Sequence, residues 1–133
     1  MKHSQSSSYL DLGHYKLHLR NLVPLKPSQA PVLMLHGAIE NGRIFYSHSG
    51  KGFGCFLADQ GFPTYCADFA GRGLSKPRVK DGLAHSQNQL ICADIPALIN
   101  ELYELHQQPL HIVCHSWGGV VLVDSLLRFA ELR

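Results

Sequence analysis

Three short, mostly apolar runs in the sequence are separated by segments in which apolar residues recur at helical spacing. The runs cover residues 32–35, 62–67 and 110–114, and Pro31 and Gly37 bound the first. Short runs of this kind are typical of strands buried on both faces of a parallel sheet. With helices between them, they predict an α/β fold in which a mostly parallel sheet has helices on both faces.

The segments between the runs carry helix signals. Residues 52–60 can form a helix that ends at Gly61, and residues 87–106 have the apolar spacing of an amphipathic helix in which Pro96 introduces a kink. Residues 117–130 are apolar nearly all round, as in a helix packed deeply against a sheet. The order strand, helix, strand therefore extends along the chain.

The N-terminal residues follow two different patterns. Residues 1–8 are polar and rich in serine, which predicts a flexible tail, whereas Tyr15, Leu17 and Leu19 alternate with polar residues as in a half-buried strand. Residues 9–133 contain no low-complexity linker or internal repeat. We therefore expect one domain over residues 9–133, preceded by a short tail.

Composition excludes several function classes. The 133 residues carry a formal charge of +2 without any run of basic residues, which argues against a nucleic-acid partner. The sequence shows neither a signal peptide at its start nor an apolar stretch long enough for a membrane span, so a cytoplasmic location is expected. The four cysteines are widely separated, as expected for reduced, mostly buried thiols.

The segment Cys114–Gly119 carries the strongest chemical signal, because it joins an apolar strand to an apolar helix. A sharp turn there would expose the Ser116 hydroxyl above the sheet edge as a nucleophile. The turn requires small residues near the serine, and Gly118 meets that need. It also places the Trp117 amide at a helix N-terminus, where it can stabilise negative charge on a carbonyl oxygen.

Metal and dinucleotide sites are weaker interpretations of the same regions. On a strand, His111 and His115 would face opposite to Cys114, so these three side chains would not converge on one metal ion. The glycines of residues 68–75 lack the third glycine of a dinucleotide fingerprint, because Lys76 stands at that position. We therefore predict neither a metal nor a cofactor.

Three motifs give the chain its resemblance to the α/β-hydrolase family. His-Gly-Ala at 36–38, Asp-Phe-Ala-Gly-Arg-Gly-Leu-Ser at 68–75 and Cys-His-Ser-Trp-Gly at 114–118 each follow an apolar strand. The resemblance implies hydrolysis of an ester, amide or related acyl bond through an acyl-enzyme. By resemblance, the site consists of the nucleophile Ser116, the oxyanion-hole amides of Ala38 and Trp117, and the shaping residues His36, Gly37, His115 and Gly118.

The histidine and acid of the family's catalytic triad follow the nucleophile in sequence, and residues 117–133 contain no histidine. The resemblance thus covers the N-terminal half of the family's domain, truncated after the nucleophile helix. We expect His36 to fix its own loop and the His115 side chain to point away from the serine. Asp94 and Asp124 lie in predicted helices, where surface or capping roles are expected.

Two function hypotheses follow from this pattern. The first is a serine hydrolase for a small-molecule acyl substrate, catalytically incomplete as given because the triad acid and histidine are absent. The second is a non-catalytic fragment, or one half of a split protein that acts through association with another chain. An open strand edge at residues 110–115 would favour self-association or a complementing C-terminal chain.

Overall fold

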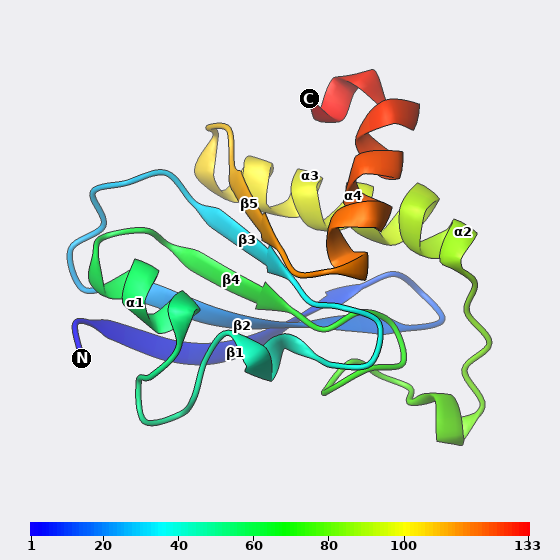
Figure 1. Cartoon of the computed structure of the whole chain (residues 1–133), viewed down its shortest axis with the longest axis horizontal. Coiled ribbons are helices and arrows are strands. Elements are labelled where there is room, and N and C mark those ends of the chain that lie inside the picture. The colour runs from blue at the N-terminus through cyan, green and yellow to red at the C-terminus, as the bar shows by residue number, and fades with distance from the viewer.

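Five strands form one sheet in the computed structural model, which describes residues 1–133 (Figure 1). Their order across the sheet is β1-β2-β4-β3-β5. The first two strands are antiparallel to their neighbours, whereas β3 is parallel to both β4 and β5. The strands are β1 (His3–Asp11), β2 (Lys16–Pro24), β3 (Val32–Leu35), β4 (Thr64–Ala67) and β5 (His111–Cys114).

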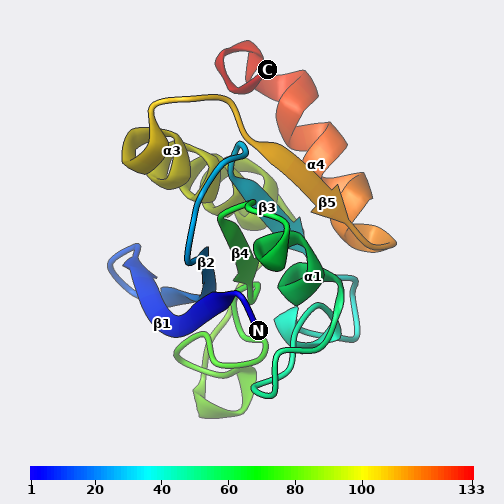
Figure 2. The same ribbon diagram turned by 90° about the vertical axis from the view of Figure 1, so that its left-hand side faces the viewer.

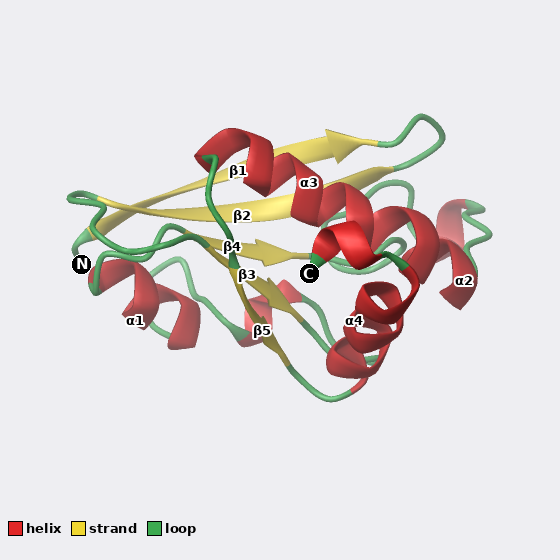
Figure 3. Cartoon of the chain, turned by 90° about the horizontal axis from the view of Figure 1, so that it is seen from above, coloured by secondary structure: helices red, strands yellow, loops and turns green.

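Helices cover both faces of this sheet, as the sequence predicts. They are α1 (Phe53–Asp59), α2 (Gln87–Gln89), α3 (Ile95–His106) and α4 (Trp117–Arg128). Figure 2 shows α1 and α3 on opposite sides of the strands. Figure 3 shows α4 starting where the loop after β5 ends, at the same end of the molecule as α2. The predicted alternation of strands and helices is therefore confirmed.

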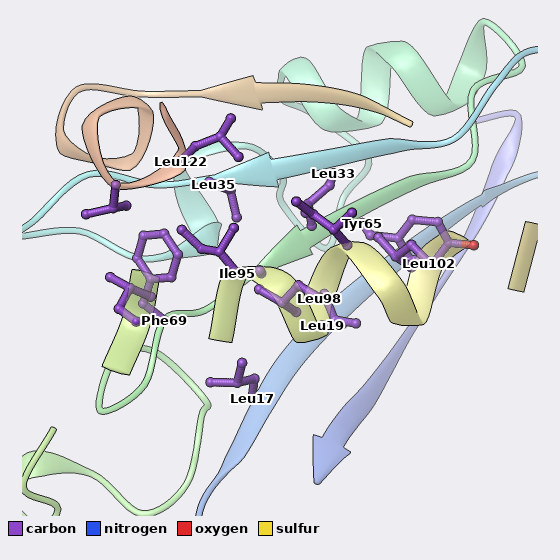
Figure 4. Close-up of a cluster of buried hydrophobic side chains, with 14 of the residues drawn as sticks. Leu17, Leu19, Leu33, Leu35, Tyr65, Phe69, Ile95, Leu98, Leu102 and Leu122 are labelled. Atoms are coloured by element: carbon purple, nitrogen blue, oxygen red, sulfur yellow. The ribbon is translucent and has the colours of Figure 1, made fainter. Parts of the chain in front are cut away.

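The two faces of β3 explain why its sequence is apolar throughout. Leu33 and Leu35 pack in a core cluster with residues of α3 and α4, and Figure 4 shows them above Ile95. Val32 and Met34 point to the other face, where they join a smaller cluster that includes residues of α1. Because successive side chains of a strand alternate between faces, a strand covered on both sides requires no polar position.

The N-terminal segment is not the flexible tail that its serine-rich composition predicts. His3–Asp11 forms β1, which pairs with β2 in continuous antiparallel register. His3 is buried, and its ring lies 2.7 Å from the Asp59 carboxylate at the end of α1. Serine side chains of β1 also contact polar groups of β2; for example, the Ser7 hydroxyl forms a hydrogen bond with the His18 ring. Polar contacts across the hairpin thus replace the apolar alternation that would have revealed this strand.

The helix predicted over residues 87–106 is interrupted before Pro96. Between α2 and α3 the chain forms a π-helical turn at Leu90–Asp94, and Pro96 lies in the first turn of α3. Proline lacks the backbone N–H that a continuous α-helix would use, so the wider turn relieves the break in hydrogen bonding. The expected kink is therefore a change of helix type just before the proline. The glycine predicted to end the first helix, Gly61, does follow α1, with φ of 98°.

Candidate active site

The three loops with chemical motifs meet at one edge of the sheet. They follow β3, β4 and β5, which run parallel to one another. Parallel strands present their carboxyl ends at a common edge, where open α/β sheets place their binding sites. The motifs at 36–38, 68–75 and 114–118 are therefore neighbours although they are far apart in sequence.

Ser116 lies in a strained turn between β5 and α4. Its φ of 54° and ψ of −123° are unusual for a residue other than glycine. Such a backbone conformation costs about 1–3 kcal/mol and persists only where the surrounding structure enforces it. The side chain is exposed and does not cap α4, so the hydroxyl is free to meet a substrate.

Close backbone packing enforces this turn. A Cβ atom added to Gly118 would lie 2.5 Å from the His36 carbonyl oxygen and 2.9 Å from the Leu35 carbonyl oxygen. The first turn of α4 therefore rests directly on the end of β3, and only glycine fits there. Two residues before the serine, Cys114 is half-buried, and burial raises the pKa of its thiol.

His36 joins the loop after β3 to the loop after β4. Its buried ring accepts a hydrogen bond from the Phe69 N–H at Nε2 (3.0 Å), and its Nδ1 donates to the Gly37 carbonyl oxygen (2.7 Å). Burial lowers the pKa of this histidine, which favours the neutral ring with the proton on Nδ1. The expected loop-fixing contact of His36 is therefore present.

The amides of Ala38 and Trp117 both have N–H groups available for a substrate oxygen. Ala38 is exposed, and its N–H donates to no other backbone group. Trp117 is the first residue of α4, where the N–H has no intrahelical acceptor. This arrangement is compatible with an oxyanion hole, which for these two amides stays a prediction.

Glu40 is a site residue that the sequence did not single out. One of its carboxylate oxygens accepts the Gly37 N–H at 2.5 Å and also contacts Nδ1 of His115. The hydrogen bond from His115 contributes most to lowering the pKa of Glu40, and the Gly37 N–H adds to it. His115 thus turns toward Glu40. Only the position of Glu40, three residues after Gly37, could have suggested this contact.

Asp68 organises the loops from beneath the site. Its buried carboxylate accepts the N–H groups of Gly42 (2.7 Å) and Leu74 (2.9 Å), and it lies 2.8 Å from the His18 ring. A Cβ on Gly73 would lie 2.4 Å from the Asp68 carboxyl carbon, which explains the glycine in this motif. Burial acts to raise the pKa of Asp68, but these hydrogen bonds outweigh it and hold the pKa below its usual range.

The two other candidate acids differ from each other. Asp124 is a partly exposed helix residue that pairs with Arg128, as expected for a surface carboxylate. The surface or capping role predicted for Asp94 is wrong. Asp94 is fully buried and accepts hydrogen bonds from Tyr15 Oη (2.5 Å) and His85 Nε2 (2.6 Å), while burial raises its pKa. Tyr15 is 79 residues from Asp94 and His85 lies in the loop before α2, so helical periodicity could not reveal these partners.

A cavity of about 560 Å³ opens beside the nucleophile turn. Phe69, Leu83, Leu90 and Trp117 contribute apolar surface to it. The Phe69 and Trp117 rings meet edge to face at 5.7 Å between centroids. The lining thus reaches Trp117, the residue after Ser116, and it combines apolar side chains with polar ones such as Arg72 and Gln87. No group of three or more potential ligands that could hold a metal ion occurs in the structure.

A match to a family model identifies the family of this chain. Residues 26–131 match the model described as "Serine aminopeptidase, S33". The chain belongs to this α/β-hydrolase family. The match includes all three motifs of the site. No helix of this chain has the length and apolar character needed to cross a membrane.

Two curated relatives are each 29% identical to this chain. The alignment with triacylglycerol lipase 1 of Arabidopsis thaliana is 122 positions long and covers 84% of this chain and 31% of the lipase. The alignment with sterol esterase 2 of Saccharomyces cerevisiae is 117 positions long and covers 82% of this chain and 22% of the esterase. The chain thus spans a third or less of the length of these relatives.

Solved structures resemble this chain over most of its length. A thioesterase domain from the curacin biosynthetic pathway has a TM-score of 0.71 and 25% identity, covering 92% of this chain and 40% of that domain. An epoxide hydrolase from Acinetobacter nosocomialis has a TM-score of 0.66 and 16% identity, covering 96% of this chain and 35% of that one. The second likeness supports the fold alone.

Proposed function

We propose that this protein is a serine hydrolase that cleaves an ester or related acyl bond through an acyl-enzyme on Ser116. The single observation that carries the proposal is the strained, exposed conformation of Ser116 at the start of α4. Strain of this kind is retained where function requires it. The Ser116 oxygen attacks the acyl carbon, and the Ala38 and Trp117 amides stabilise the resulting oxyanion.

An apolar acyl group fits this proposal best. The cavity beside the turn is bordered by Phe69 and Trp117, so an acyl chain there would lie next to the nucleophile. The two curated relatives are a triacylglycerol lipase and a sterol esterase, and the similar thioesterase domain acts on another acyl bond. These relatives favour an acyl ester or thioester over the epoxide that the more distant structural neighbour cleaves.

We propose that the general base for Ser116 is neither of the two histidines beside it. The two histidines of the site are engaged elsewhere, His36 with Phe69 and Gly37 and His115 with Glu40. Without a base, an enzyme of this kind retains about 10³–10⁴-fold catalysis over water from oxyanion stabilisation and binding. We therefore propose slow hydrolysis by the 133-residue chain.

Covalent labelling with a fluorophosphonate tests the nucleophile directly. The Ser116 oxygen displaces fluoride from phosphorus, so intact mass measurement should find one adduct, located on Ser116 by peptide mapping. Ser116→Ala should abolish the adduct and the slow hydrolysis of a short-chain nitrophenyl ester. Ser49→Ala, which removes another exposed hydroxyl, should change neither. An adduct that survives in Ser116→Ala would contradict the proposal.

A second candidate function, association with another polypeptide, is favoured by a difference between the two edges of the sheet. The outer strand β1 contains several exposed serines, whereas β5 at the opposite edge reads His-Ile-Val-Cys. Exposed apolar side chains at Val120, Val123 and Leu127 lie on the adjoining helix α4. An apolar, unpaired strand is a template for pairing with another chain. We therefore propose that a second copy pairs along β5.

Sedimentation velocity at micromolar concentration tests this association. His111 and His115 donate their N–H groups to the β3 side, so the Ile112 N–H faces the open edge. Ile112→Pro should therefore block edge pairing and give a monomer, while Ile112→Val should associate like the unmodified chain. A wild-type chain that stays a stable, cooperatively unfolding monomer would exclude the second copy.

A further inference from the structure

One carboxylate oxygen connects the two segments that carry the candidate oxyanion amides. Oε1 of Glu40 accepts the Gly37 N–H at 2.5 Å and contacts Nδ1 of His115. Gly37 directly precedes Ala38, and His115 is two residues before Trp117. The contact therefore spans the loop after β3 and the nucleophile turn, at the residues next to the proposed reaction site.

Gly37, Glu40 and His115 lie close together at this contact. A Cβ on Gly37 would lie 2.6 Å from the same Glu40 oxygen and 3.4 Å from Nδ1 of His115. The His115 backbone is held independently, because its N–H donates to the Leu35 carbonyl oxygen at 3.0 Å. The Glu40 side chain thus acts on the loop after β3 through the Gly37 N–H, and on the nucleophile turn through the His115 ring.

We infer that Glu40 is a positioning residue that sets the separation of the Ala38 and Trp117 amides through its shared contact with Gly37 and His115. This inference rests on the proposed function. Glu40 does not touch the reacting atoms, and it acts through the two residues that it connects. The requirement is strict because oxyanion donors stabilise charge only when both lie within hydrogen-bond distance of one oxygen.

The electrostatics of the contact support this role. The two histidines that face the Glu40 carboxylate are His115, in direct contact, and His36, at longer range. The hydrogen bond from His115 is the largest cause of the lowered pKa of Glu40, which keeps the carboxylate ionised at neutral pH. An ionised carboxylate oxygen has enough acceptor capacity to serve both the amide and the ring at once.

The inference is tested by comparing Glu40→Ala with Glu40→Gln in the 133-residue chain. The glutamine oxygen can still accept the Gly37 N–H, whereas alanine cannot. Amide spectra of ¹⁵N-labelled protein report the backbone directly, and the rate of fluorophosphonate labelling reports Ser116. Glu101→Ala, which removes an exposed carboxylate on α3, is the matched control.

In Glu40→Ala we expect the Gly37, Ala38 and Trp117 amide resonances to shift and the labelling rate to fall about tenfold or more. Glu40→Gln should restore the Gly37 resonance and most of the rate, and Glu101→Ala should resemble the wild type. Unchanged Gly37, Ala38 and Trp117 resonances in Glu40→Ala would overturn the inference, as would a labelling rate within about twofold of wild type.

Failure of the proposed function gives a different result. A wild-type chain that forms no Ser116 adduct contradicts the proposed function without reference to Glu40. The amide resonances then decide the inference alone, because a shift of both Ala38 and Trp117 in Glu40→Ala supports the positioning contact and its absence overturns it.

Discussion

The nucleophile turn and the loop after β3 lie at the same sheet edge, but different interactions hold them. The turn depends on close contact between Gly118 and backbone carbonyl groups, with no room for a side chain. The loop depends on hydrogen bonds that the ionisable side chains of His36, Glu40 and Asp68 accept from backbone N–H groups. The turn should therefore be sensitive to added atoms, and the loop to lost hydrogen bonds and to pH.

Removal of the buried carboxylate at position 68 should have the largest effect. Asp68→Ala leaves His18 and the N–H groups of Gly42 and Leu74 without their acceptor. Breaking a buried hydrogen-bonded pair of this kind costs about 3–5 kcal/mol. Urea denaturation should show that loss in the free energy of unfolding, with Asp81→Ala, an exposed carboxylate, as the control. A loss below about 1 kcal/mol would contradict this account of the loop.

A methyl group in the nucleophile turn should have the next largest effect. Gly118→Ala would place a Cβ 2.5 Å from the His36 carbonyl oxygen, and overpacking of this kind costs about 1–3 kcal/mol. Gly119→Ala is the matched control, because its Cβ would meet only the Cys114 Cβ at 3.5 Å. Thermal unfolding should show a lower Tm for Gly118→Ala alone. Equal Tm values for the two variants would mean that the turn can relax.

A fall in pH should change the stability contributions of the two buried aspartates, Asp68 and Asp94, in opposite directions. The pKa of Asp68 is held below its usual range, so its ionised form contributes stability above about pH 4 that is lost as pH falls through the lowered folded pKa. The stability difference between wild type and Asp68→Asn should therefore shrink from pH 6 to about pH 3.

Asp94 provides the internal comparison for this experiment. Burial raises its pKa, so ionisation above the unfolded value opposes folding, and Asp94→Asn should gain stability relative to wild type as pH rises. Urea denaturation at a series of pH values measures both variants. If both changed in the same direction with pH, the assigned pKa shifts would be wrong.

The smallest effect is expected at Cys114. The turn forms with this half-buried cysteine in place, and Cys114→Gly removes atoms from its crowded side. We expect a change in unfolding free energy within about 1 kcal/mol, from the flexibility of glycine in a strand, and unchanged or improved geometry at Ser116. Amide spectra would reveal a disordered Ser116 in the variant, which would show that the Cys114 side chain supports the turn.

The fold could be predicted largely because its parallel strands are short apolar runs separated by helical segments. Residues 32–35 and 110–114 are recognisable from local composition alone, and the intervening helix α3 has regular apolar spacing. The strand β1 could not be recognised in this way. Its serines form hydrogen bonds with side chains of the neighbouring strand β2. From composition alone, a serine-rich segment is predicted to be unstructured.

The residues of the site show the same difference between local patterns and long-range contacts. Ser116, Gly118 and the loop at 36–38 lie in contiguous motifs whose local geometry follows from residue size and turn chemistry. The contacts of Glu40 and Asp94 could not be predicted, because the partners lie in other parts of the chain: His115 is 75 residues from Glu40, and Tyr15 is 79 residues from Asp94. Contacts of that sequence separation depend on the complete topology.

The position of β3 also has a consequence for the kinetics of folding. This central strand pairs with β4 through Val32 and Thr64, and with β5 through Val32 and His111, a far larger separation along the chain. Closing the longer loop is entropically slower, so we expect β1 to β4 to assemble first. Pulsed hydrogen exchange should then protect Met34 before His115; simultaneous protection would contradict this order. The Ser116 turn would accordingly be acquired in the final step of folding, when β5 docks.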